Sequence, residues 1–321
     1  DDELAQVVEG SRSTLPEKLN WRIHEMYVRQ DFDACLRIIE DQLRATKGQS
    51  EYALYMKALI YRHFGRIQES LHTFQAALCL NPVNVSNLKQ VGYSLHLLGK
   101  HKSAIDVFEE AEQLNPDERD LHHNKAVCYL HMNSHDNAIN SFETANSIQR
   151  HEATFLQLGK LYEQQNRNQD ALAAYIDASE LVPENAELLT TIGLLYKRMG
   201  NDTKAFEFFG NSLTYDPKNV RSLLAAASII QENQDIDVAL SKYRTAIHQC
   251  RHCAELWNNI GLCFFSKSFQ SQESKIIAAI SCLRRDSYLS PLSWKIKYNL
   301  GIFYLTMGQF VSSLQNLSAA I

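Results

Sequence analysis

The sequence lacks a long apolar run and lacks a strong excess of charge of either sign. A membrane-spanning helix needs about 20 consecutive apolar residues, whereas the longest obvious apolar stretch extends only from Leu223 to Ile230. The net charge is −5 and the isoelectric point is near 6.2, and nucleic-acid-binding domains usually carry a basic face instead. Direct membrane insertion and a nucleic-acid partner are therefore not expected.

Proline is scarce, the number of cysteines is odd, and the N-terminal segment is not expected to be a signal peptide. Six prolines and a hydrophobic content of 45% fit a helix-rich, water-soluble chain. Seven cysteines, mostly within apparent helices, indicate reduced thiols and a cytoplasmic location. Residues 1–15 are acidic and polar, unlike a signal peptide, and are expected to form a disordered lead-in or a cloning remnant.

No catalytic or nucleotide-binding motif is present. The sequence contains no GxGxxG, GxxxxGK[ST], HExxH or GxSxG pattern. The segment from His248 to Cys253 places two histidines around a C-x-x-C pair, but structural zinc needs four ligands and no second C-x-x-C exists. We therefore expect no enzyme, no cofactor and no metal.

A period of 34 residues runs through nearly the whole chain. Small residues recur at intervals of 34, 33, 34, 34, 34 and 40, at Gly92, Ala126, Gly159, Gly193, Ala227, Gly261 and Gly301. Self-similarity at 34 residues is typical of the tetratricopeptide repeat, a pair of antiparallel helices. The sequence thus predicts an all-α fold, a right-handed superhelical solenoid of such repeats.

The residue types of the repeat follow from helix packing. Small residues such as Gly92, Ala104 and Ala205 are expected to let the two helices of a pair approach closely. Aromatic residues such as Tyr196 and Phe209 are expected to fill the space to the next pair, and Trp257 belongs to the same pattern. Gly99 and Gly200 should end first helices, and Pro116, Pro183 and Pro217 should stop second helices.

The period divides residues 16–321 into one array of nine units: 16–49, 51–84, 85–118, 119–151, 152–185, 186–219, 220–253, 254–293 and 294–321. The last unit is incomplete, since the chain ends inside its second helix. The eighth unit is six residues longer than the usual 34, and its polar stretch 266–275 is expected to form a long turn. The fourth unit gathers His122, His123, His131, His135 and His151, which we interpret as solvated or capping histidines.

First helices line the concave face of such arrays, and two rows of residues are expected there. One row carries side-chain amides at Asn124, Gln157, Asn259 and Asn299, which can pair with a peptide backbone. The other is mostly apolar and includes Tyr93, Val127, Leu194, Leu262 and Ile302, as expected of a protein-binding groove. The alternatives are that asparagine is common at its position whatever the array binds, and that some apolar residues pack between adjacent first helices.

Several segments are more specific than the repeat pattern, namely 88–109, 187–217, 256–265, 278–291 and 298–310. On these segments the sequence resembles the family of the fourth Bardet–Biedl syndrome protein. The resemblance implies a non-enzymatic scaffold subunit of the BBSome, the complex that moves membrane proteins into and out of cilia. It implies as partners the other BBSome subunits, with centriolar-satellite and dynein–dynactin components, and a location at the cilium, the basal body or centrosome, and centriolar satellites.

Two other functions remain open from the residues alone. One is the substrate-recruiting repeat region of a larger enzyme, for which asparagine should occupy the amide row in nearly every unit. Only Asn124, Asn259 and Asn299 do so in the third to ninth units. The other is an adaptor for motor or cell-cycle machinery, which the sequence does not distinguish from a scaffold.

Overall fold

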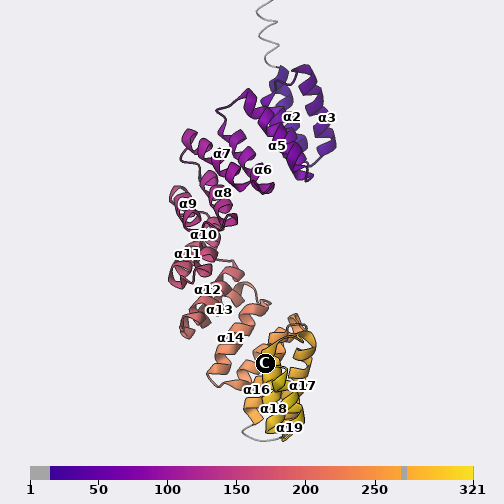
Figure 1. Ribbon diagram of the computed structural model, residues 1–321, viewed down its shortest axis with the longest axis vertical. Coiled ribbons are helices and arrows are strands. Elements are labelled where there is room, and N and C mark those ends of the chain that lie inside the picture. The colour runs from indigo at the N-terminus through magenta and orange to yellow at the C-terminus, as the bar shows by residue number, and fades with distance from the viewer. Residues whose placement is uncertain (1–14, 269–272, 321) are drawn as a thin grey trace, which may run out of the picture. The chain divides into compact units, whose positions relative to one another are not determined.

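The computed structural model describes residues 15–268 and 273–320, and in these ranges the secondary structure is helical. The expected lead-in, apart from Leu15, lies outside the described residues. The helices follow one another in pairs (Figure 1). Their bounds are α2 Leu15–Val28, α3 Phe32–Ala45, α4 Glu51–His63, α5 Ile67–Leu80, α6 Val85–Leu97, α7 His101–Leu114, α8 Arg119–His131, α9 His135–Ile148, α10 Glu152–Gln164, α11 Asn168–Leu181, α12 Ala186–Arg198, α13 Asp202–Tyr215, α14 Val220–Glu232, α15 Ile236–Gln249, α16 Ala254–Ser268, α17 Glu273–Leu289, α18 Trp294–Thr306 and α19 Phe310–Ser318.

The repeat period corresponds to helix length. A typical first helix has 13 residues and a typical second helix has 14, as in α6 and α7.

The chain divides into two compact units, one up to Leu161 and one from Tyr162, so the division falls within α10. From here on, "first unit" and "second unit" mean these two parts of the chain, and a single helix pair is called a repeat. No helix in the described part of the chain is long and apolar enough to cross a membrane. The all-α class expected from the 34-residue period is confirmed.

The short turns between paired helices require a left-handed residue. Gly99 has φ +75° and Gly200 has φ +76°, a conformation that costs glycine little. After α6, the Gly99 and Lys100 amides donate to the carbonyls of His96 and Leu95, which satisfies carbonyls at the helix end. At the equivalent turns Asn133, Asn166 and Gln234 adopt positive φ without being glycine.

The eighth repeat differs from our prediction. The stretch 266–275 was expected to be a long polar turn, but α16 continues to Ser268 and α17 starts at Glu273. Residues 269–272, including Phe269 of the insertion, lie outside the described residues. The extra length goes into the helices, which have 15 and 17 residues. The stretch contains no glycine or proline, so nothing in it opposes helix extension.

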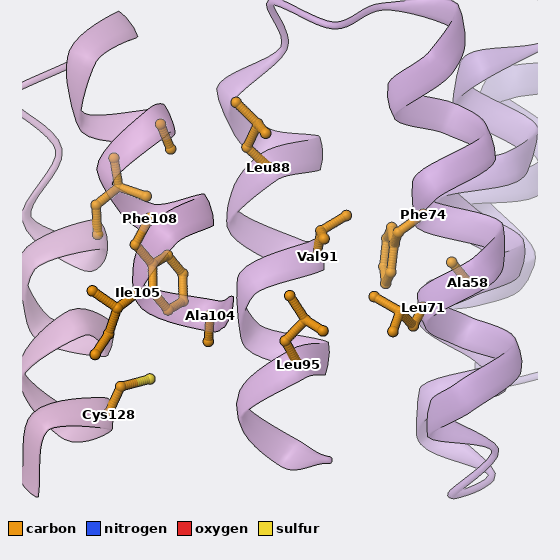
Figure 2. Packing of buried hydrophobic residues seen from close by; sticks show 12 residues of the cluster. Ala58, Leu71, Phe74, Leu88, Val91, Leu95, Ala104, Ile105, Phe108 and Cys128 are labelled. Atoms are coloured by element: carbon orange, nitrogen blue, oxygen red, sulfur yellow. The ribbon is translucent and has the colours of Figure 1, made fainter. Parts of the chain in front are cut away.

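Small residues and large side chains meet within each helix pair. A Cβ added to Gly92 would lie 2.6 Å from the Phe108 ring, and one added to Gly193 would lie 2.6 Å from the Phe209 ring. In Figure 2 the Phe108 ring of α7 lies beside α6, while Val91 of α6 points toward Phe74 of α5. Our prediction that Phe209 fills the space to the next pair did not include this contact within its own pair. Its ring packs on Gly193 of its own pair, because glycine leaves room there.

Candidate functional site

In the first unit, a small hollow opens along the first helices α4, α6 and α8. Its volume is about 200 Å³, and it is lined by Arg62, Lys89, Gln90, Tyr93, Asp120 and Asn124. We call it the Arg62 hollow. Tyr93, whose exposed fraction is 38%, and Asn124 both belong to the rows predicted from the sequence. Arg62, Lys89 and Asp120 add charges that the sequence analysis missed.

The Arg62 hollow combines an aromatic wall with charges of both signs. The Arg62 guanidinium lies 4.9 Å from the centroid of the Tyr93 ring, and burial lowers its pKa. Its Nη1 is buried without a hydrogen-bond partner among the described residues. Burial opposes the charge of Lys89, but the hydrogen bond and charge of Glu118, with the charge of Asp120, raise the Lys89 pKa. The hollow can therefore bind a polar or acidic side chain beside an aromatic ring.

The second unit has a larger hollow along α12, α14 and α16. It encloses about 410 Å³ and is lined by Leu194, Lys197, Arg221, Leu224, Ala225, Ser228, Glu255 and Asn259. We call it the Leu194 hollow. Lys197 Nζ donates to Ser228 Oγ at 2.5 Å and pairs with Glu232 Oε1 at 2.9 Å. Two predicted residues, Leu194 and Asn259, thus share an amphipathic surface with an exposed cation, Arg221.

A third hollow, of about 460 Å³, lies along α16, α17 and α18 in the second unit. It is lined by Ala254, Glu255, Asn258, Asn259, Asp286, Ser290, Ser293, Trp294, Lys295 and Ile296. We call it the Asp286 hollow. Asp286 has an exposed fraction of 1%, and neither of its carboxylate oxygens has a hydrogen-bond partner among the described residues. Burial, assisted by the charge of Glu255, raises the pKa of Asp286 to about 7.

In the second to seventh repeats, the position equivalent to Asp286 is occupied by a residue with a small side chain. The equivalent residues are all fully buried: Ala77, Ala111, Ala145, Ala178, Ser212 and Ala246. A comparable carboxylate in the first unit is satisfied, since Glu51 accepts from Asn81 at 3.1 Å and from Asn87 at 2.6 Å. Asp286 was not predicted, although the 34-residue register places this aspartate where other repeats have alanine or serine.

The remaining predicted groove residues are half-buried or engaged in contacts within the chain. Val127 on α8 and Gln157 on α10 are half-buried. Leu262 on α16 and Ile302 on α18 are also half-buried and pack against the cluster that contains Leu283 and Leu300. For these two, the alternative of packing between helices is supported. Asn299 donates to Asn258 Oδ1 at 2.8 Å, so its amide is already engaged within the chain.

The signature residues lie at contacts between helices. Ala104 and Ala205 are fully buried, and a Cβ on Gly261 or Gly301 would contact Leu283 or Leu317. Gly159 is buried on α10. The Tyr196 ring stacks on Phe208 with centroids 5.4 Å apart. Trp257 Nε1 donates to the Arg251 carbonyl at 3.0 Å. These contacts agree with the structural role expected of the signature residues.

The predicted histidine cluster does not come together as one group. His122 bonds to the Pro116 carbonyl at 3.0 Å, His123 bonds to Thr154 Oγ1 at 3.0 Å, and His151 accepts from the Ala153 amide at 3.2 Å. These contacts agree with capping and structural roles. His131 ends α8 and His135 begins α9, so these two histidines flank the turn between the helices.

Comparisons with known proteins agree with this architecture. Family models described as "Tetratricopeptide repeat" and "TPR repeat" match residues 51–84, 90–118, 120–152 and 186–219, and residues 159–200, respectively. Among solved structures, the C-terminal part of a TPR repeat-containing protein from Cytophaga hutchinsonii is similar with a TM-score of 0.58. It is 14% identical, and the match covers 72% of this chain and 95% of that one. At this identity the likeness shows the fold alone.

Curated relatives extend the comparison to nearly the whole chain. The BBSome complex member BBS4 of Bos taurus is 48% identical over 305 residues, which is 95% of this chain and 58% of the relative. The BBS4 homolog of Drosophila melanogaster is 34% identical over 316 residues, which is 94% of this chain and 64% of the relative. The chain therefore spans less than two thirds of the length of these relatives. The resemblance drawn from the sequence is confirmed, and the chain belongs to the BBSome complex member BBS4 family of tetratricopeptide-repeat proteins.

Proposed function

We propose that the protein is a non-enzymatic scaffold subunit of the BBSome that supports assembly and ciliary membrane-protein trafficking through protein–protein contacts. The observation that carries the proposal is the identity of 48% over 95% of the chain to a protein named as a BBSome complex member. The match covers 58% and 64% of the relatives of Bos taurus and Drosophila melanogaster, so the role of the whole relatives comes to this chain as a proposal.

The hollows along the first helices supply the binding surface in this proposal. The Arg62 hollow combines an aromatic wall with charged groups, and the Leu194 hollow combines apolar walls with charged groups. Such mixtures are found at the core and rim of protein interfaces. Partners would be other BBSome subunits, and the association would place the protein at the cilium. Contacts with centriolar-satellite and dynein–dynactin components, and a location at the basal body and satellites, belong to the same proposal.

Charge substitution in the Leu194 hollow tests the proposal. We expect Leu194→Glu and Arg221→Glu each to reduce recovery of the other BBSome subunits by roughly thirtyfold, since loss of a central contact costs about 2 kcal/mol. Recovery is measured by quantitative mass spectrometry of tagged full-length protein purified from ciliated cells. Circular dichroism checks that helicity is unchanged. Arg221 is exposed, so its variant should fold even if Leu194→Glu does not.

The matched control is Val238→Glu, which places the same charge on an apolar residue of a second helix with 51% exposure. This variant should assemble like the unmodified protein. Normal assembly of both hollow variants together with loss in Val238→Glu would move the interface to the second helices. Absence of BBSome subunits from the unmodified protein would overturn the proposed function itself.

A further inference from the structure

Three helices bring histidine and cysteine side chains together in the first unit. His96 lies in the last turn of α6, His101 is the first residue of α7, and Cys128 lies near the end of α8. Cys128 Sγ is 3.3 Å from His96 Nδ1. The nearest ligand atoms of His96, His101 and Cys128 all lie within 4.8 Å of one another, the one such group of three or more among the described residues.

A fourth side chain, His131, closes the cluster. It is the last residue of α8, and its ring centroid lies 5.1 Å from that of His96 and 5.0 Å from that of His101. His131 is exposed while Cys128 is fully buried. The cluster therefore has a closed inner end at the thiol and an outer end that solvent reaches.

Packing within the chain does not use all the ligand atoms of this cluster. The thiol of Cys128 contacts His96 Nδ1, and the rings of His101 and His131 stack with 7° between their planes. His101 Nδ1 is nevertheless buried without a hydrogen-bond partner in the part of the chain that the structure describes. A buried nitrogen with a lone pair and no partner is unfavourable unless something binds there.

We propose that His96, His101, Cys128 and His131 form a zinc site that joins the third and fourth repeats. A thiolate with imidazole nitrogens is the donor set of structural zinc, and magnesium or calcium would need oxygen ligands. Zinc–sulfur and zinc–nitrogen bonds of about 2.3 and 2.0–2.1 Å place tetrahedral ligand atoms roughly 3.3–3.8 Å apart. Cys128 Sγ and His96 Nδ1 already lie 3.3 Å apart, and the ligand atoms of His96, His101 and Cys128 lie within 4.8 Å of one another.

Zinc binding by this set has a defined proton balance. The metal binds the Cys128 thiolate, so the thiol proton is released to solvent, and the three histidines donate lone pairs from neutral rings. No electron is transferred, because zinc does not change oxidation state. The site would fasten the end of α6 and the start of α7 to the end of α8. The first unit should therefore become more stable when zinc is bound.

Cobalt(II) is the probe for the test, since it binds zinc sites and gives a visible spectrum with a thiolate-to-metal absorption band. The chain is first treated with a chelator, then titrated with Co²⁺, and Zn²⁺ is added in competition. We expect one Co²⁺ per chain with a tetrahedral spectrum that Zn²⁺ abolishes. Cys128→Ser should remove the thiolate band, and His101→Gln should weaken binding at least tenfold, roughly the minimum loss seen even for the outer partners of metal ligands.

Matched controls separate this site from other thiols and imidazoles. Cys79→Ser and His72→Gln replace exposed residues of the same types on α5 and should leave the spectrum unchanged. A thiolate band that survives in Cys128→Ser but disappears when Cys250 and Cys253 are both replaced by serine would move the metal to the C-x-x-C segment. That result would overturn the proposal, and so would the absence of any thiolate band in the unmodified chain.

Discussion

Replacing Asp286 by alanine is expected to stabilise the protein, and the gain should grow as the pH rises. Asp286 is buried, and its carboxylate lacks a hydrogen-bond partner among the described residues. Alanine is the residue at the equivalent place in most of the other repeats, for example at Ala246 and Ala178. The substitution therefore removes an uncompensated charge and leaves a side chain that the repeat accommodates.

The pH dependence follows from the raised pKa. The pKa of Asp286 is about 7 in the folded chain, against an ordinary value of 3.8. Between these values the folded protein keeps the proton and the unfolded chain loses it, so the folded state becomes relatively less stable as pH rises. Ionisation of Asp286 therefore lowers the free energy of unfolding by about 4 kcal/mol at pH 8 and by less than about 1 kcal/mol at pH 4.

Chemical denaturation followed by tryptophan fluorescence measures this effect locally. Trp257 on α16 and Trp294 on α18 belong to the helices beside α17. Asp286→Asn is the control, since it keeps a buried polar group but removes the charge, and it should abolish the pH dependence. Equal stability of Asp286→Ala and the unmodified chain at pH 8 would mean that the carboxylate is compensated in the folded protein.

Truncation of Phe209 should destabilise the protein by about as much as replacement of Asp286 stabilises it at pH 8. The ring is fully buried and packs on Gly193 within the sixth repeat. We expect Phe209→Ala to lower the free energy of unfolding by about 3–5 kcal/mol, because it leaves a cavity between α12 and α13. In a repeat array each unit contacts mainly its neighbours. Amide hydrogen exchange should therefore show the loss of protection concentrated around α12 and α13.

A double-mutant cycle with Gly193 separates the contact from general loss of packing. Gly193→Ala alone should be destabilising by about 1–3 kcal/mol through overpacking, because its Cβ would meet the Phe209 ring at 2.6 Å. In the Phe209→Ala background the same change should stabilise the protein, since the added methyl group enters the cavity and alanine favours the helix. Additive effects of the two substitutions would show that the ring does not lie on Gly193.

The parts of the fold that depend on local pattern were predictable, and the parts that depend on contacts between repeats were not. Gly99 and Gly200 at the ends of first helices identify turns, because only a few residue types adopt positive φ readily. The extension of α16 to Ser268 was not predicted, since a polar stretch without glycine or proline is compatible with both a turn and a helix. The position of the Phe209 ring depends on a glycine sixteen residues earlier, on another helix.

The candidate sites show the same division. Tyr93, Asn124, Leu194 and Asn259 line hollows because their place in the first helix determines their direction. The grouping of His96, His101 and Cys128 was missed, because it joins the ends of three helices from two repeats. The histidines that are close in sequence around His122 suggested a different cluster, and proximity along the chain does not decide which side chains meet.

The turns between paired helices have a consequence for how this protein can change over evolutionary time. Asn133, Asn166 and Gln234 adopt the left-handed conformation that Gly65, Gly99, Gly200 and Gly308 adopt elsewhere. Each non-glycine residue there costs on the order of 1 kcal/mol of strain, which a glycine would relieve. These turns lie apart from the residues that line the Arg62, Leu194 and Asp286 hollows. Heat tolerance can therefore change one turn at a time, while the residues that line these hollows stay the same.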